Sequence, residues 1–299
     1  MSYLPFYITP EKFEQECFKN KEKIEYSVGS MQWIAKNIEH KNRYDRKLFW
    51  LGYVVLTILL IAFVTGFDIE VWTFENELGY VFIPIIIIIN YIYYFVFALD
   101  DRYEYSFSSE GFSYSKQLDQ PKIINSIAQK VAYVACAFCV FAVIFIGPMA
   151  LAGAGGSLLL AFGMTKKRDH HVETATIPAD QFISARYNIK RNVICLYVKL
   201  DICKPSQEPN KVWRVYTRKE YFIFGENETQ LKKSLQILEN DIGIKCEEVS
   251  DLDLIFDYKK RPDEVKSIRI IKETFSVEDV KNKHGFPPPE RKNRSKTVA

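Results

Sequence analysis

The chain has 299 residues and a formal net charge of +3, with 48% hydrophobic and 26% charged residues. This length suits one large domain or two modest ones, and the small net charge excludes a protein that binds nucleic acid through its overall charge. The first 47 residues hold no early apolar core, so no secretory signal peptide is expected.

Residues 1–47 are expected to form a cytosolic helical arm. Thr9 followed by Pro10 is typical of a helix start. A second amphipathic helix is expected from Ser30 to Lys47, because its apolar residues have helical spacing. These apolar residues are Trp33, Ile34 and Ile38. The arm either leads into the next segment or binds a partner and oligomerises.

Two apolar hairpins are expected to cross a membrane. The first, residues 48–99, holds two apolar runs, each close to the ~20 residues that one span needs. An acidic loop without Lys or Arg separates these runs. The second hairpin, residues 131–164, has no charged residue and a turn signal at Gly147-Pro148. It either spans the membrane twice or forms a re-entrant hairpin.

Basic residues predict the topology of these hairpins. Lys and Arg lie on both flanks of the first hairpin, and Lys166, Lys167 and Arg168 follow the second. Because positively charged flanks stay on the cytosolic side, both termini are expected in the cytosol. The expected location is the bacterial inner membrane, with the lipid bilayer as a partner and the three basic residues at the membrane surface.

Polar and small residues inside the apolar runs are the candidate site residues. Pro84 removes a backbone donor from its helix, and Asn90 is a polar group at membrane depth. The small residues of the second hairpin have a spacing that lets helices approach closely: Ala152, Gly153, Gly156 and Ser157. Helix–helix contact is the favoured role for this set, and a pore lining is the alternative.

The segments outside the apolar runs predict strands. Residues 100–130 hold a β-hairpin, because aromatic and polar residues alternate on both sides of a Ser-Ser-Glu-Gly turn. Residues 165–275 hold strands at 172–177, 182–187, 192–202, 211–217 and 220–224. A helix capped by Asn227 follows these strands. Residues 276–299 form a basic, proline-containing tail that opens on a short helix capped by Ser276.

This order of strands followed by one amphipathic helix resembles a pleckstrin-homology-like (PH-like) domain. The segments that carry the resemblance are YEYSFSSEGFSYS at 103–115 and residues 172–241. They are similar to bacterial membrane proteins in which paired spans precede a PH-like domain. The expected fold is therefore an α+β membrane protein, with four transmembrane helices in two hairpins and a cytosolic PH-like β-sheet or barrel domain with a C-terminal helix. The turn of the first hairpin has no basic residue, so lipid-headgroup recognition is not carried over.

No catalytic, cofactor or metal motif is found in the sequence. Asp251, Asp253 and Asp257 share one face of a possible strand, but basic residues beside them favour a solvated face over a cation site. No cofactor or metal is therefore expected.

The favoured function is a non-enzymatic multi-pass membrane protein. Its cytosolic module would bind a protein partner or self-associate into a homo-oligomer. Two alternatives stay open at this point: a four-span effector or small channel of a bacterial stress or phage-defence system, and an enzyme without a recognised motif.

Overall fold

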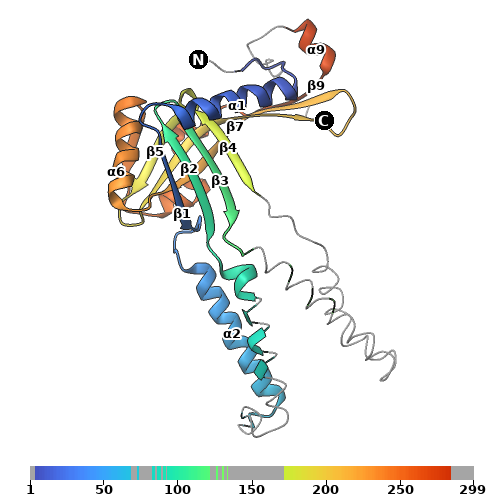
Figure 1. The fold of residues 1–299 in the computed structure, drawn as a ribbon, viewed down its shortest axis with the longest axis vertical. Helices are drawn as coiled ribbons and strands as arrows, with labels where there is room; N and C mark the ends of the chain where they lie inside the picture. The colour runs from blue at the N-terminus through green and yellow to red at the C-terminus, as the bar shows by residue number, and fades with distance from the viewer. Residues whose placement is uncertain are drawn as a thin grey trace, which may run out of the picture. The chain divides into compact units, whose positions relative to one another are not determined.

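The structure of the chain is a computed structural model, in which residues 4–68, 73, 83–84, 86–88, 90–91, 93–121, 126, 130, 133 and 172–283 are described. The chain divides into two compact units. The first consists of Met1–Ala35, Tyr103–Lys116 and Glu173–Ala299, and the second of Lys36–Arg102 and Gln117–Val172. Figure 1 labels their helices and strands.

A four-stranded sheet has the strand order β1-β2-β3-β4. Its strands are β1 (Met31–Asn37), β2 (Asp101–Ser108), β3 (Gly111–Leu118) and β4 (Glu173–Pro178). β3 and β4 are antiparallel, with Gly111 opposite Pro178 and Lys116 opposite Glu173. The predicted hairpin and the strands after residue 172 therefore belong to one sheet, although more than fifty residues separate β3 from β4 in sequence.

A five-stranded sheet has the strand order β8-β5-β6-β7-β9. Its strands are β5 (Phe182–Asn188), β6 (Val193–Pro205), β7 (Lys211–Phe224), β8 (Lys245–Glu248) and β9 (Ile271–Ser276). β8 runs parallel to β5, and the other pairs are antiparallel. β6 and β7 form one long hairpin, paired from Val193–Phe224 to Pro205–Val212. The two strands predicted at 211–217 and 220–224 are thus a single strand.

The described helices of the first unit are α1 (Pro10–Tyr26), η3 (Ala179–Gln181), α6 (Glu228–Gln236), its π-helical continuation η4 (Ile237–Asp241), α7 (Asp253–Phe256), η5 (Tyr258–Lys260), α8 (Asp263–Lys266) and α9 (Val277–Asn282). Three of them, α1, α6 and α9, begin where the sequence predicts caps. The side chains of Thr9, Asn227 and Ser276 accept hydrogen bonds from backbone N–H groups in the first turns of α1, α6 and α9. The predicted caps are confirmed.

The main core of the first unit lies between the two sheets and α6 (Figure 1). Alternate residues of β2 point into it, so Tyr103, Tyr105 and Phe107 are buried. The Tyr105 hydroxyl donates to Phe222 O at 2.9 Å and accepts from Phe224 N at 3.3 Å. These bonds connect β2 of one sheet to β7 of the other.

Residues 31–37 form a strand, so the helix predicted from Ser30 to Lys47 is wrong there. Trp33, Ala35 and Asn37 are buried and the residues between them are exposed, which is the two-residue period of a strand. The Trp33 indole donates to Phe224 O at 2.9 Å. Trp33 and Ile34 also fit a helical spacing, and only burial by distant strands separates the two readings.

The described helices of the second unit are α2 (Asp45–Val64) and the π-helical turn η2 (Tyr94–Ala98). The Trp50 ring of α2 packs on the Tyr94 ring of η2, with centroids 5.3 Å apart, and α2 also contacts residues that precede η2. The Trp50 indole donates to Asn90 O at 3.1 Å, and the Tyr53 and Tyr93 rings stack with centroids 3.9 Å apart. Most apolar side chains of α2 are exposed in the structure, including Phe49 and Phe63.

Among the described residues, α2 is the one helix that is long and apolar enough to cross a membrane, by length and composition over Asp45–Phe63. The described chain otherwise consists of two β-sheets and shorter helices, so the predicted architecture of four transmembrane helices in two hairpins is wrong. The predicted second hairpin, residues 131–164, lies outside the described residues except for residue 133.

The expected location and bilayer partner are corrected with the architecture. An integral inner-membrane protein in contact with the lipid bilayer was predicted from four spans, and the described residues hold one candidate helix. The four spans were inferred from hydropathy, which reports the composition of a run and not the structure that the run adopts. The described residues between 83 and 93 are helical, and the π-helical turn η2 follows them.

Candidate functional site

A groove of about 710 Å³ lies on the outer face of the β1–β4 sheet, within the first unit. The residues that alternate with the buried aromatics point outward into the groove, and Trp33, Tyr105 and Tyr114 of the core also border it. All four strands contribute to its lining: Gln32, Trp33, Ile34, Glu104, Tyr105, Ser106, Ser113, Tyr114, Ser115, Thr174 and Thr176. Lys21 and Glu25 of α1, together with Glu226, complete it.

The outward-facing side chains of β3 and β4 are short and carry hydroxyl groups. Ser113 and Thr176 lie on adjacent strands, with their hydroxyl oxygens 3.5 Å apart. Ser115 and Thr174 follow on the same two strands, directly opposite each other. Each hydroxyl can donate and accept a hydrogen bond. The groove therefore offers a polar surface that can bond another polypeptide while ordering few long side chains.

The charged residues around this surface are mostly paired. Glu25 lies 3.7 Å from Lys21 on α1, and Glu173 at the start of β4 lies 2.6 Å from Lys219. Burial disfavours the charged form of Glu173, but hydrogen bonds from Lys219 and Tyr114 outweigh it and hold its pKa below the usual range. Glu173 is thus ionised at neutral pH. Among the apolar side chains that line the groove, Ile34 is the most accessible, at 49% exposed.

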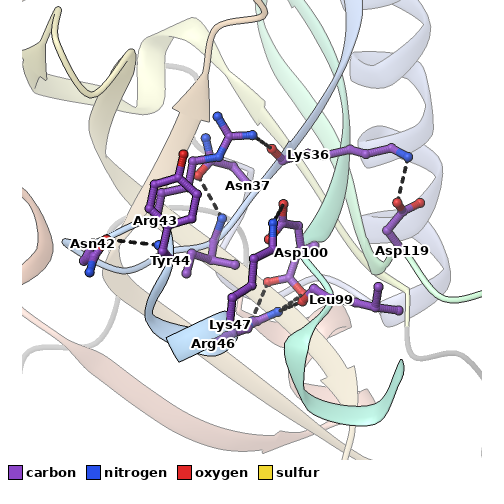
Figure 2. A network of polar contacts seen from close by, with 12 residues as sticks. Lys36, Asn37, Asn42, Arg43, Tyr44, Arg46, Lys47, Leu99, Asp100 and Asp119 are labelled. Carbon is purple, nitrogen blue, oxygen red and sulfur yellow. Dashed lines mark hydrogen bonds and ion pairs between the residues drawn. The ribbon is translucent and has the colours of Figure 1, made fainter. Parts of the chain in front are cut away.

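A polar network in the second unit secures the start of α2 (Figure 2). Arg46 binds both carboxylate oxygens of Asp101, at 3.1 and 2.9 Å, and donates to Leu99 O at 2.8 Å. Lys47 lies 3.7 Å from Asp100, the residue before β2. A two-point arginine–carboxylate pair that is partly buried is stronger than an exposed ion pair. The network therefore positions α2.

No group of three or more potential metal ligands is found among the described residues. Asp251 and Asp253, two of the three aspartates predicted to share one face, form ion pairs with a lysine. The Lys260 Nζ lies 3.6 Å from Asp251 and 3.5 Å from Asp253. Of the cysteines, Cys195 is fully buried, and burial raises the pKa of its thiol to about 12. A thiol in that state is a poor nucleophile.

Two of the sequence-predicted site residues are described. Pro84 is exposed on a helical segment. Asn90 is buried, and its side-chain amide donates to Ile86 O of the same segment at 2.9 Å. The others lie outside the described residues: Ala152, Gly153, Gly156, Ser157, Lys166, Lys167 and Arg168. Helix–helix contact or pore lining therefore stays a prediction for this set.

Sequence reasoning missed the groove. Its signal was present in the hydroxyl residues at alternate positions, Ser113 and Ser115 in one segment and Thr174 and Thr176 in another. Such residues are also typical of any solvated strand face. Only the pairing of β3 with β4 places the two sets on one surface.

Comparison with known proteins gives one family and one curated relative. A family model described as the TsiV2 immunity protein matches residues 13–263. Immunity protein TsiV2 of Vibrio cholerae serotype O1 is 36% identical over 89 residues, which are 30% of this chain and 37% of that relative. The chain therefore matches little more than a third of the relative's length. No solved structure matches the chain.

The family match corrects the resemblance to PH-like membrane proteins, which is wrong. The matched family is a different one, and its model covers most of the chain rather than the strand segments alone. The order of elements also differs from that of a PH-like domain, in which one helix follows seven strands. Here β8 and β9 follow α6 in sequence, and they form the two edges of the five-stranded sheet.

Proposed function

The chain belongs to the TsiV2 immunity protein family, and from this membership we propose that it protects the cell that makes it by binding a protein toxin. The observation that carries the proposal is the family match across residues 13–263. Such a protein acts through a binding surface and a protein partner, and it requires no reaction of its own.

Membership in this family overturns the earlier functional hypotheses. A multi-pass membrane protein with a PH-like module, a four-span effector or channel, and an unrecognised enzyme do not fit an immunity protein family. The predicted protein partner is retained, because binding to another protein agrees with an immunity protein family.

The groove on the β1–β4 sheet is the surface that we assign to the toxin. Three features support this assignment. Its hydroxyl groups at Ser113, Ser115 and Thr174 offer hydrogen bonds, and interfaces between separately folded proteins are about as polar as the remaining surface. Short side chains lose little conformational freedom when they bind. Ile34 provides an accessible apolar side chain in the same groove.

The experiment uses contact killing between sister cells. The gene for this chain is deleted from a strain that carries it, and the deletion strain is grown in contact with its parent. We expect the parent's toxin to reduce survival of the deletion strain, and a plasmid copy of the gene to restore it. Equal survival of the deletion strain and the parent would contradict the immunity function.

A second arm tests the groove. Thr174→Arg places a long, positively charged side chain in the groove. Thr274→Arg is the matched control. Both threonines are exposed and lie on edge strands, β4 and β9. A blocked interface weakens binding by about tenfold or more, since each 1.4 kcal/mol lost is about tenfold. Protection should fall with Thr174→Arg and persist with Thr274→Arg, at equal protein abundance. Full protection by Thr174→Arg would mean that the toxin binds elsewhere.

A further inference from the structure

The segment before α1 is held by side chains of β6 and β7 through its backbone. The Tyr216 hydroxyl donates to Leu4 O at 3.0 Å, and the Arg214 Nη2 donates to Pro5 O at 3.4 Å. The Cys203 thiol lies 3.6 Å from Ile8 O. Three carbonyl groups are therefore bound within five residues. Contacts to carbonyl groups do not depend on the side chain of the bound residue, so another peptide could make them.

Two adjacent aromatic residues of this segment fill an aromatic pocket. The Phe6 side chain is fully buried, with its ring centroid 5.4 Å from that of Tyr216 and 6.1 Å from that of Phe275. The Tyr7 ring packs on Phe275 at 5.1 Å, and the Lys283 ammonium lies 5.1 Å from the Tyr7 centroid. The pocket thus selects a pair of neighbouring aromatic side chains.

Arg214 has hydrogen-bonding capacity that the segment does not use. Its side chain is fully buried, and its Nη2 lies 2.7 Å from Asp201 Oδ2. Within the described part of the chain, Arg214 Nε and Nη1 and Asp201 Oδ1 have no hydrogen-bond partner. Buried polar groups are rarely left unpaired, because each one loses its bonds to water. The segment and the Phe13 ring, whose centroid lies 4.8 Å from the Arg214 guanidinium, enclose this pair.

We propose that Asp201, Cys203, Arg214, Tyr216 and Phe275 form a binding site for a short non-helical peptide with two adjacent aromatic residues, and that residues 4–8 occupy this strap site in cis. The strap site is separate from the groove assigned to the toxin and does not depend on that assignment. An anionic ligand is disfavoured, because the Asp201 carboxylate lies beside the unused donors.

The test uses the full-length chain and a labelled synthetic peptide of residues 1–9, with binding measured by fluorescence anisotropy. Phe6→Ala weakens the strap, so this variant should bind the peptide at least about tenfold more tightly than the wild-type chain, whose site is already filled. Phe18→Ala is the matched control, because Phe18 is 61% exposed on α1. This control should bind the peptide no better than the wild type.

Two further arms establish specificity. A peptide with alanine in place of Phe6 should bind about tenfold more weakly, and Tyr216→Phe in the Phe6→Ala chain should weaken binding about threefold to tenfold. Denaturant unfolding reports whether each variant is folded. If Phe6→Ala is unfolded, Tyr7→Ala, which removes the less buried ring, takes its place. Absence of binding to the folded strap variant, or equal binding to the wild type, would overturn the proposal.

Discussion

Replacing Tyr105 with Phe removes one oxygen atom from the core between the two sheets. In the wild type this hydroxyl donates to Phe222 O at 2.9 Å and accepts from Phe224 N at 3.3 Å. The Tyr105 side chain is 2% exposed, so water cannot replace these bonds without opening the core. The Trp33 ring, at a centroid distance of 5.0 Å, covers the same region.

The expected loss follows from these two bonds. A hydrogen bond contributes a net ~0.5–1.5 kcal/mol to folding, and a buried partner left unsatisfied costs ~1–3 kcal/mol. The ring itself stays, so packing is nearly unchanged. We therefore expect Tyr105→Phe to lower the free energy of unfolding by about 2–3 kcal/mol. This is a large share of the ~5–15 kcal/mol that keeps a typical domain folded.

Urea unfolding followed by tryptophan fluorescence measures this change. Tyr26→Phe is the matched control, since Tyr26 is 84% exposed and surface substitutions stay within about 0.5 kcal/mol. The slope of the unfolding free energy against urea should be the same in both variants. A loss below about 0.5 kcal/mol for Tyr105→Phe would refute the reasoning. It would mean that the hydroxyl does not connect the two sheets.

Three further outcomes are expected from folding measurements. Asn227→Ala removes the cap of α6 and should lower the unfolding free energy by about 1 kcal/mol, while Asn227→Ser should restore most of it. Gly111→Ala should lower it by about 1–3 kcal/mol, because Gly111 has a φ of +147° and an added Cβ would lie 2.4 Å from Ile177 O; an unchanged urea midpoint would contradict this. Burial raises the pKa of Asp201 to about 7 despite the nearby Arg214, so the folded chain binds this proton more tightly than the unfolded chain. The stabilisation is then complete below about pH 4 and is lost as the pH rises to about 7, so the thermal midpoint should fall less steeply over this range in Asp201→Asn than in the wild type.

Local features of this fold were predictable because their causes lie within a few residues. The alternation around the Ser-Ser-Glu-Gly turn predicted the hairpin that the structure shows as β2 and β3. The helix starts at Thr9, Asn227 and Ser276 followed from cap chemistry, in which a side chain bonds a backbone group two or three residues away. Neither feature depends on contacts with distant parts of the chain.

Tertiary structure decided the features that depend on distant partners. Residues 31–37 fit both a helical and a strand pattern, and pairing with β2 and burial of Trp33 against Phe224 select the strand. β9 pairs with β7 across nearly fifty residues of sequence, and no local pattern specifies that neighbour. The groove forms for the same reason, because Ser113 and Thr176 become neighbours only when β3 and β4 pair. Four spans were predicted from apolar composition, whereas among the described residues one helix is long and apolar enough to cross a membrane. Arg214 is fully buried because Asp201, Phe13 and the carbonyl of Pro5 meet around it, and all three come from other segments of the chain.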